Sequence, residues 1–181
     1  MSATSNPIFQ QLQLLMTGYA YNFYGKREIA RADDLLIRER AAETLGQAVN
    51  ALTQQEAEFG RLYIPPMTRE NPVPPADAML AFKELTRHKE KVKDLGVRIR
   101  GMSVPSQDKT WLRFRDEVPL LSMLVQFDYN LIRGTMDLRD LALGMSASSW
   151  RDSSAGSALD QHLTLLDQTV RQRTELLQIP G

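Results

Sequence analysis

Few residues in this chain could carry chemistry. Its 181 residues include no cysteine and only two histidines, His88 and His162. The lack of thiols excludes disulfides, thiolate nucleophiles and cysteine-ligated metal sites. Glu84 lies four residues before His88 on the same helix face, but a di-iron carboxylate bundle needs two Glu-x-x-His pairs, and this chain has none. We therefore predict no metal and no cofactor, with His88 solvated among its basic neighbours.

Nucleophilic chemistry has no better support. No serine lies in a Gly-x-Ser-x-Gly turn, and no glycine-rich phosphate loop occurs. The carboxylate of interest is Asp128, which shares a helix face with Leu124, Val125 and Ile132. A carboxylate drawn into a core must be paired or protonated. We favour an internal salt bridge or hydrogen bond that fixes helix register over a catalytic acid, and the sequence predicts a protein that is not an enzyme.

Basic residues gather in one segment of a chain whose 22 basic and 22 acidic residues give no net charge. Residues 81–115 hold ten basic and four acidic side chains. Four of the ten basic residues recur at spacings of four or seven on one helix face. We call these four the basic stripe: Lys83, Arg87, Lys91 and Arg98. The stripe is either a solvated face, a docking surface for an acidic protein, or a phosphate-binding surface. Nucleic acid is the least favoured partner because the stripe lacks interleaved aromatic residues.

Trp150 and Arg151 are the other candidate protein-binding residues. They lie in a serine-rich segment, residues 146–157. Trp150 either folds back over the end of the helices or stands exposed as an anchor for a partner. Residues 72–75 fit a PxxP ligand pattern, but a stiff connection between helices explains them equally well.

The spacing of apolar residues predicts helices throughout. Asn6 and Pro7 begin the first, whose stripe continues to Phe23. A second, long helix is expected to end near Leu62. Residues 39–46 within it resemble the first half of a helix-turn-helix, but the polar Gln47 favours an uninterrupted helix. Further helices are expected over 76–102, 108–114 and 119–145, and from Ser157 onward, with Gly134 and Gly144 marking close helix approach.

The fold predicted from these elements is an all-α, up-down helical bundle of four to five helices, two of them long. No alternating strand pattern is present. Residues 1–181 form a single domain, with a proline-rich connection at 64–76 and a serine-rich loop at 146–157. The seven-residue apolar repeat of 42–63 fits burial inside the bundle or against a second copy, so a homodimer stays open.

We expect a cytoplasmic protein, since the sequence shows neither a secretory signal nor a run of about 18 apolar residues that could span a membrane. The predicted function is a non-catalytic accessory or adaptor protein that docks on a larger partner with an acidic surface, as an assembly or stabilising factor. Its candidate surfaces are the basic stripe, the Trp150 loop and the proline-rich connection. The alternatives are a small-molecule- or metal-binding bundle that uses Asp128 and inward tyrosines, and a nucleic-acid-binding regulator that uses residues 83–115.

Overall fold

Four long helices lie side by side in the computed structural model, which describes residues 7–25, 30–69, 73–102, 104–105, 108–151 and 154–178. Over these residues the chain is helical and contains no strand, so the predicted all-α bundle is confirmed. The elements are α1 (Pro7–Leu15), α2 (Ala30–Tyr63), α3 (Ala76–Arg100), α4 (Asp108–Asp116), α5 (Val118–Gly144), the 3-10 helix η3 (Ala147–Trp150) and α6 (Ser154–Gln178).

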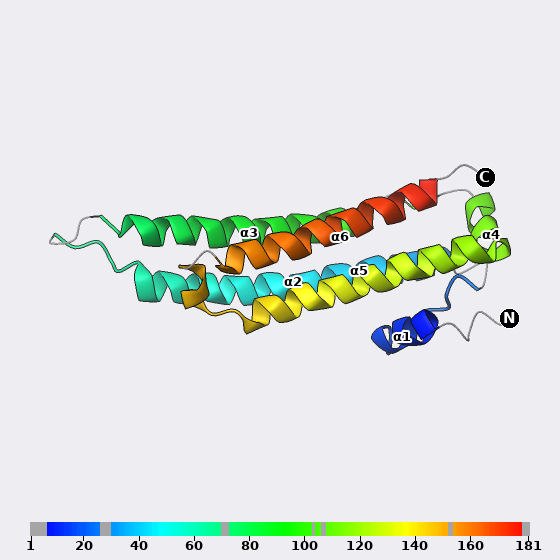
Figure 1. The fold of residues 1–181 in the computed structure, drawn as a ribbon, viewed down its shortest axis with the longest axis horizontal. Coiled ribbons are helices and arrows are strands. Elements are labelled where there is room, and N and C mark those ends of the chain that lie inside the picture. The colour runs from blue at the N-terminus through cyan, green and yellow to red at the C-terminus, as the bar shows by residue number, and fades with distance from the viewer. Residues whose placement is uncertain are drawn as a thin grey trace.

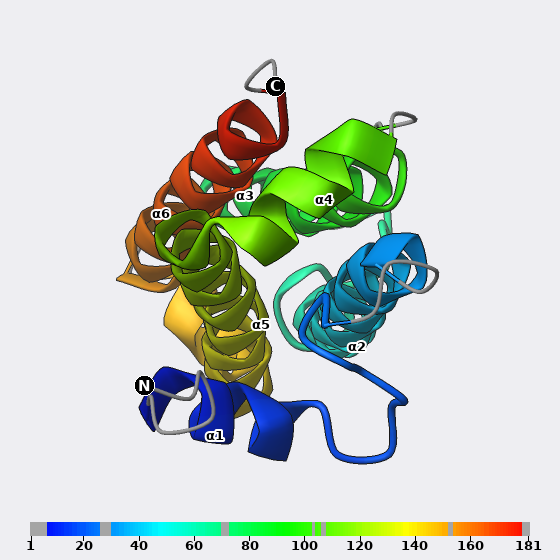
Figure 2. The same cartoon turned by 90° about the vertical axis from the view of Figure 1, so that its right-hand side faces the viewer.

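The bundle alternates in direction, but not every pair of consecutive helices is adjacent. α2 packs against α3 and α5, and α6 packs against α5 and α3 (Figure 1). Figure 2 shows α4 lying across one end of the bundle, between the end of α3 and the start of α5. Through α4 the chain crosses from α3 to α5, and these two helices lie diagonally opposite each other in the bundle. As a result α3 and α6 are parallel neighbours.

The seven-residue repeat of α2 is buried within this chain's own bundle. Ile37, Leu45, Leu52 and Phe59 are at most 1% exposed. A second copy is therefore not needed to cover this stripe. Residues 39–46 lie inside continuous helix, so the helix-turn-helix alternative is wrong.

The first helix is shorter than predicted: α1 ends at Leu15 and lies against α5. Gly18 has φ of +92°, and Phe23 and Tyr24 have φ of 54° and 58°. A right-handed helix cannot continue through these left-handed conformations. The chain instead turns back, which directs Tyr24 into the core.

Three further local predictions differ in outcome. A Cβ on Gly134 would lie 2.8 Å from the Leu166 Cδ2 atom, which confirms close approach of α5 and α6 there. Gly144 has no atom within 4 Å of such a Cβ, so that prediction is wrong. The last helix begins at Ser154 rather than Ser157, because its first turn packs on α3: a Cβ on Gly156 would lie 3.1 Å from the ring of His88.

Candidate functional site

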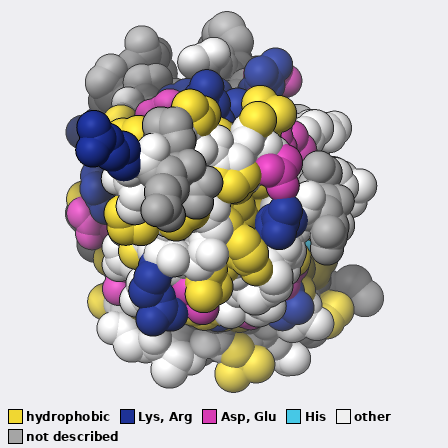
Figure 3. Space-filling view, turned by 90° about the vertical axis from the view of Figure 1, so that its left-hand side faces the viewer, with side chains coloured by type: hydrophobic (Ala, Val, Ile, Leu, Met, Phe, Trp, Pro, Cys, Tyr) yellow, Lys and Arg dark blue, Asp and Glu magenta, His cyan; other side chains and the backbone are white. Residues whose placement is uncertain are grey.

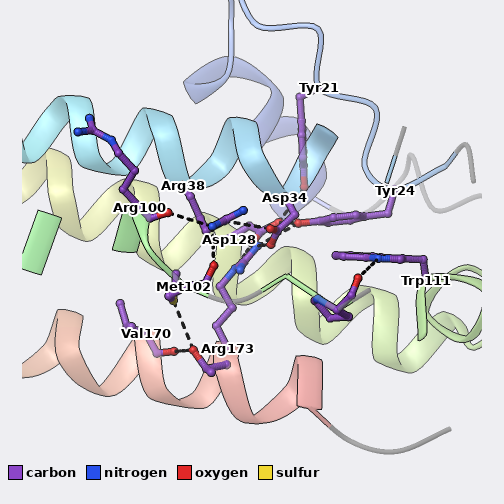
Figure 4. Close-up of polar contacts among 12 residues, drawn as sticks. Tyr21, Tyr24, Asp34, Arg38, Arg100, Met102, Trp111, Asp128, Val170 and Arg173 are labelled. Carbon is purple, nitrogen blue, oxygen red and sulfur yellow. Dashed lines mark hydrogen bonds and ion pairs between the residues drawn. The ribbon is translucent and has the colours of Figure 1, made fainter. Parts of the chain in front are cut away.

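A cluster of buried charged and phenolic side chains joins the helices at the end of the bundle that α4 covers (Figure 4). Its centre is Arg173 of α6, which is 1% exposed. The Arg173 Nε atom donates to Asp128 Oδ1 of α5 at 2.7 Å, and Nη2 donates to Asp34 Oδ1 of α2 at 2.8 Å. One guanidinium therefore bridges carboxylates of two other helices.

Two tyrosines from the segment after α1 complete the shell of Asp128. The hydroxyl groups of Tyr21 and Tyr24 donate to its Oδ2 atom at 2.9 and 2.7 Å. The Tyr24 hydroxyl also accepts from Arg173 Nη2 at 3.2 Å. The Tyr24 ring stacks on Trp111 of α4, with ring centroids 5.8 Å apart. The aromatic rings thus separate the charges from solvent.

The start of α2 extends the cluster toward α3. Asp34 Oδ2 accepts from Arg38 Nε at 3.0 Å, and Arg38 Nη1 donates to the carbonyl oxygens of Arg100 and Met102 at 3.1 and 2.7 Å. These carbonyls lie where α3 ends and have no helical donor of their own. Asp33 accepts from the backbone N–H groups of Asn22 and Tyr24 at 3.0 and 2.8 Å. The cluster therefore fixes α3 and the segment after α1 as well as α2, α5 and α6.

This geometry favours a structural role for Asp128. Burial raises its pKa, against the opposing effect of the Arg173 guanidinium. Both carboxylate oxygens are already engaged by side chains of the chain itself. A fully satisfied buried network rigidifies a core and specifies one packing. The internal salt bridge expected from the helical spacing is present, and its partners were missed by the sequence reasoning.

Stability at alkaline pH is expected to depend on this cluster. Burial, with the neighbouring Asp128 charge, raises the pKa of Tyr21 and Tyr24 well above 10.0. The unfolded chain then loses the two phenolic protons at a lower pH than the folded chain does. The difference in pKa between the folded and the unfolded chain adds to the free energy of unfolding. This contribution is fully present below about pH 10 and is lost as the pH rises further.

The measurement is the free energy of unfolding in urea from pH 8 to 11, with phenolate absorbance followed in parallel. We expect Tyr21 and Tyr24 to ionise only on unfolding. The Tyr21→Phe/Tyr24→Phe variant, which lacks both groups, is expected to show a shallower decline above pH 10. Parallel declines in the two proteins would contradict this account.

The basic stripe faces acidic residues of this same chain. Lys91 Nζ donates to Asp160 Oδ1 of α6 at 2.7 Å, and Arg87 lies 3.9 Å from Asp160 Oδ2. Arg98 pairs with Asp167, one heptad further along α6. The hydrogen bond from Lys91 holds the pKa of Asp160 below its usual range. Most of the stripe thus serves the contact between α3 and α6, while Lys83 is exposed and has no ion-pair partner among the described residues.

His88 is buried rather than solvated, which corrects the sequence prediction. Its Nδ1 atom lies 2.8 Å from the Glu84 carbonyl oxygen, and Nε2 lies 3.2 Å from Asp160 Oδ1 without hydrogen-bond alignment. The absence of a side chain on Gly156 leaves room for the ring. His88 therefore belongs to the packing between α3 and the first turn of α6.

Trp150 is 3% exposed, so the interpretation as an exposed anchor is wrong and the side chain covers the bundle end. Its Nε1 atom donates to Gln55 Oε1 at 2.8 Å, and Gln55 Nε2 donates to the Ala142 carbonyl oxygen. Arg151 donates to Asp77 at 2.5 Å and lies over the ring of Tyr63. Both predicted binding residues thus attach η3 to its neighbouring helices.

Four exposed apolar side chains lie at the end of the α2–α3 hairpin. We call the described residues 61–69 and 73–83 the hairpin tip. Leu62, Met67, Val73 and Leu80 are 53–77% exposed there. Figure 1 shows the connection reaching past η3 and the adjoining ends of α5 and α6. Viewed from this end, hydrophobic side chains spread across the face among Lys, Arg, Asp and Glu side chains (Figure 3).

Within the described residues, no three histidine, aspartate or glutamate side chains are grouped so as to hold a metal ion. No helix in the described part of the chain is both long enough and apolar enough to cross a bilayer. No protein-family model matches the chain, and comparison with curated proteins and with solved structures likewise gave no match.

Proposed function

We propose that this chain is a non-catalytic accessory protein that docks on a larger protein through the hairpin tip. The observation that carries the proposal is the exposure of Leu62, Met67, Val73 and Leu80 on one short segment. Single exposed apolar residues are normal on a protein surface, but their concentration on one projecting end is typical of an interaction site.

The other surfaces suggested by the sequence are already used within the chain. Arg87, Lys91 and Arg98 pair with α6, and Trp150 is buried. Of the three candidate docking surfaces, this leaves the proline-rich connection. The nucleic-acid alternative loses support because most of the stripe is neutralised by α6. The ligand-binding alternative loses support because Asp128 is fully engaged.

Contacts among α2, α3 and Arg151 fix the base of the hairpin tip. Phe59 packs against Tyr63 and Phe82, with ring centroids 4.8 and 6.2 Å apart. Arg151 links this base to η3 through Asp77. Prolines at positions 65, 66, 74 and 75 restrict the backbone of the connection. A preorganised surface loses little conformational entropy on binding, which favours specific docking.

A cytoplasmic location stays a prediction.

The proposal is tested by placing a photo-crosslinking residue at position 67 of the full chain in its native cells. The matched control carries the same residue at position 14, because Met67 and Leu14 are both 73% exposed. We expect a discrete crosslinked protein from position 67 and not from position 14. The Met67→Asp/Val73→Asp variant is expected to lose this partner with its free energy of unfolding unchanged to within about 0.5 kcal/mol. Equal crosslinking from both positions, or none from position 67, would refute docking at the tip.

A further inference from the structure

We infer that Asp160 is a built-in counter-ion that allows the buried His88 ring to take up a second proton without detaching α6 from α3. The contact between the first turn of α6 and α3 is thereby kept from neutral to mildly acidic pH. This inference goes beyond docking at the hairpin tip and does not depend on it.

The neutral His88 ring carries its proton on Nδ1. That atom lies 2.8 Å from the carbonyl oxygen of Glu84, and a carbonyl oxygen can only accept a hydrogen bond. The Nε2 atom therefore holds a lone pair. It is buried and has no hydrogen-bond partner among the described residues. Nε2 is thus the position at which a second proton binds.

The carboxylate of Asp160 is placed to neutralise this second proton. Its Oδ1 atom lies 3.2 Å from Nε2 of His88, which is within ion-pair distance. The hydrogen bond from Lys91 to the same oxygen lowers the pKa of Asp160, so the carboxylate is ionised over the range in which histidine titrates. The Asp160 side chain is 44% exposed, so it also connects the buried ring with solvent, from which the proton comes.

Two cations and a second carboxylate of α3 also face this site. Lys91 Nζ lies 2.7 Å from Asp160 Oδ1, and Arg87 Nη2 lies 3.9 Å from Oδ2. Both basic side chains are about half exposed, so water and salt screen their repulsion of a charged ring. A Cβ on Gly156 would lie 3.1 Å from both Glu84 Oε2 and the ring Cε1 atom, so the Glu84 carboxylate is close to the ring as well. Two carboxylates thus oppose two cations around the ring.

The elements on the other sides contribute uncharged groups. The Trp150 ring of η3 lies with its centroid 5.6 Å from that of His88, and Gln55 of α2 accepts from the indole N–H group. The charged side chains next to these two residues in the chain are themselves in ion pairs, Arg151 with Asp77 and Glu56 with Lys89. Asp160 is therefore the group placed to balance a charge on Nε2.

A buried histidine that lacks a counter-ion is sensitive to acid. An isolated charge is costly to bury, so the chain must open before such a ring takes up its second proton. Here opening means detaching the first turn of α6, because Gly156 packs directly on the ring. As the pH falls, an open state that charges freely gains over a closed state that cannot charge. One pH unit below the ordinary histidine pKa of about 6.5, this gain is about tenfold.

The test compares Asp160→Asn with Asp167→Asn in the full chain. Asparagine keeps the shape of each side chain and removes its charge. Asp167 is the matched control, because it also pairs with the basic stripe, but its ion-pair partners are arginines rather than a histidine. Amide hydrogen exchange of residues 158–163, measured by NMR at pH 7.5 and 5.5 and corrected for the intrinsic exchange rate, reports opening of α6. The protonation of the His88 ring is followed by 15N NMR, with the half-buried His162 as an internal comparison.

Between pH 7.5 and 5.5, we expect the protection of residues 158–163 to change by less than about twofold in the unmodified chain and in Asp167→Asn. In Asp160→Asn it is expected to fall about tenfold. Adding His88→Gln to Asp160→Asn removes the titrating group and is expected to abolish this pH dependence. In the unmodified chain, both ring nitrogens of His88 are expected to be protonated at pH 5.5 while protection is retained.

Three results would overturn the inference. One is an equal loss of protection in Asp160→Asn and Asp167→Asn. Another is a His88 ring that stays neutral in the folded, unmodified chain at pH 5.5. The third is a loss of protection in the unmodified chain as the ring becomes protonated, since Asp160 would then not hold α6 in place.

Discussion

Replacing Arg173 with methionine is expected to lower the free energy of unfolding by about 3–5 kcal/mol. Methionine is similar in length to the arginine stem and can keep its apolar contacts, while the buried guanidinium group is lost. The loss comes from the charge: Asp34 loses one of its two guanidinium partners, and Asp128 loses its ion pair. Breaking a buried pair on one side leaves an uncompensated carboxylate in the core. Urea unfolding at pH 7, followed by far-ultraviolet circular dichroism, measures the change.

Arg171 supplies the matched control. It lies two residues earlier on α6, and its ion pair with Asp167 is exposed on the arginine side. Arg171→Met is expected to cost less than about 1 kcal/mol. Adding Asp128→Asn to Arg173→Met removes the stranded charge and is expected to recover part of the lost stability. If Arg173→Met and Arg171→Met destabilised the protein equally, the cluster would not hold the helices in register.

Trp150→Ala is expected to destabilise the fold by about 3–5 kcal/mol. The indole is buried between η3, α2 and α3, so its removal leaves a cavity and takes the donor away from Gln55. Trp150→Phe keeps most of the apolar contact and loses the hydrogen bond, for which about 1–2 kcal/mol is expected. Thermal and urea unfolding of the two variants separate these contributions.

This experiment also distinguishes a core residue from a binding residue. Below the unfolding transition, Trp150→Phe is expected to retain crosslinking from position 67, since Trp150 does not belong to the exposed surface. Trp150→Ala could instead leave the free energy of unfolding unchanged and abolish crosslinking to the partner. In that case Trp150 would be a binding residue.

The sequence could predict the elements of the fold because each long helix buries a stripe of regular period. α2 and α3 follow their apolar spacing closely, and the prolines at 65–75 separate them. The first helix was extended too far because Tyr19 and Phe23 continue its spacing. Gly18, with its positive φ, was the available sign of a break.

The buried cluster was predictable only in part. Asp128 could be placed inside by its apolar neighbours on one helix. Arg173 offers the same signal, since it lies between Val170 and Leu177 on the buried stripe of α6. That it meets Asp34, 139 positions earlier, depends on which helices are adjacent, and helical periodicity does not encode this. His88 was misplaced because its basic neighbours obscured its position between Leu85 and Val92.

The acidic partner of the basic stripe could have been recognised in the sequence by its spacing. Lys91 and Arg98 are seven residues apart, and so are Asp160 and Asp167, with both pairs separated by 69 positions. Equal spacing on two parallel helices allows such a ladder to form. Without the order of the helices, however, the same charges fit an external partner equally well.

The crossing helix α4 separates the chain into two helical hairpins, and this division affects how the chain folds. α2 with α3, and α5 with α6, are two helical hairpins whose internal contacts are close in sequence, so each is expected to form quickly. The contacts of Arg173 with Asp34 and of Lys91 with Asp160 join one hairpin to the other and require closure of a much longer loop. Folding is therefore expected to be limited by docking of two preformed halves. The same halves, exchanged between two chains, would give a domain-swapped dimer that preserves the contacts between α2 or α3 and α5 or α6.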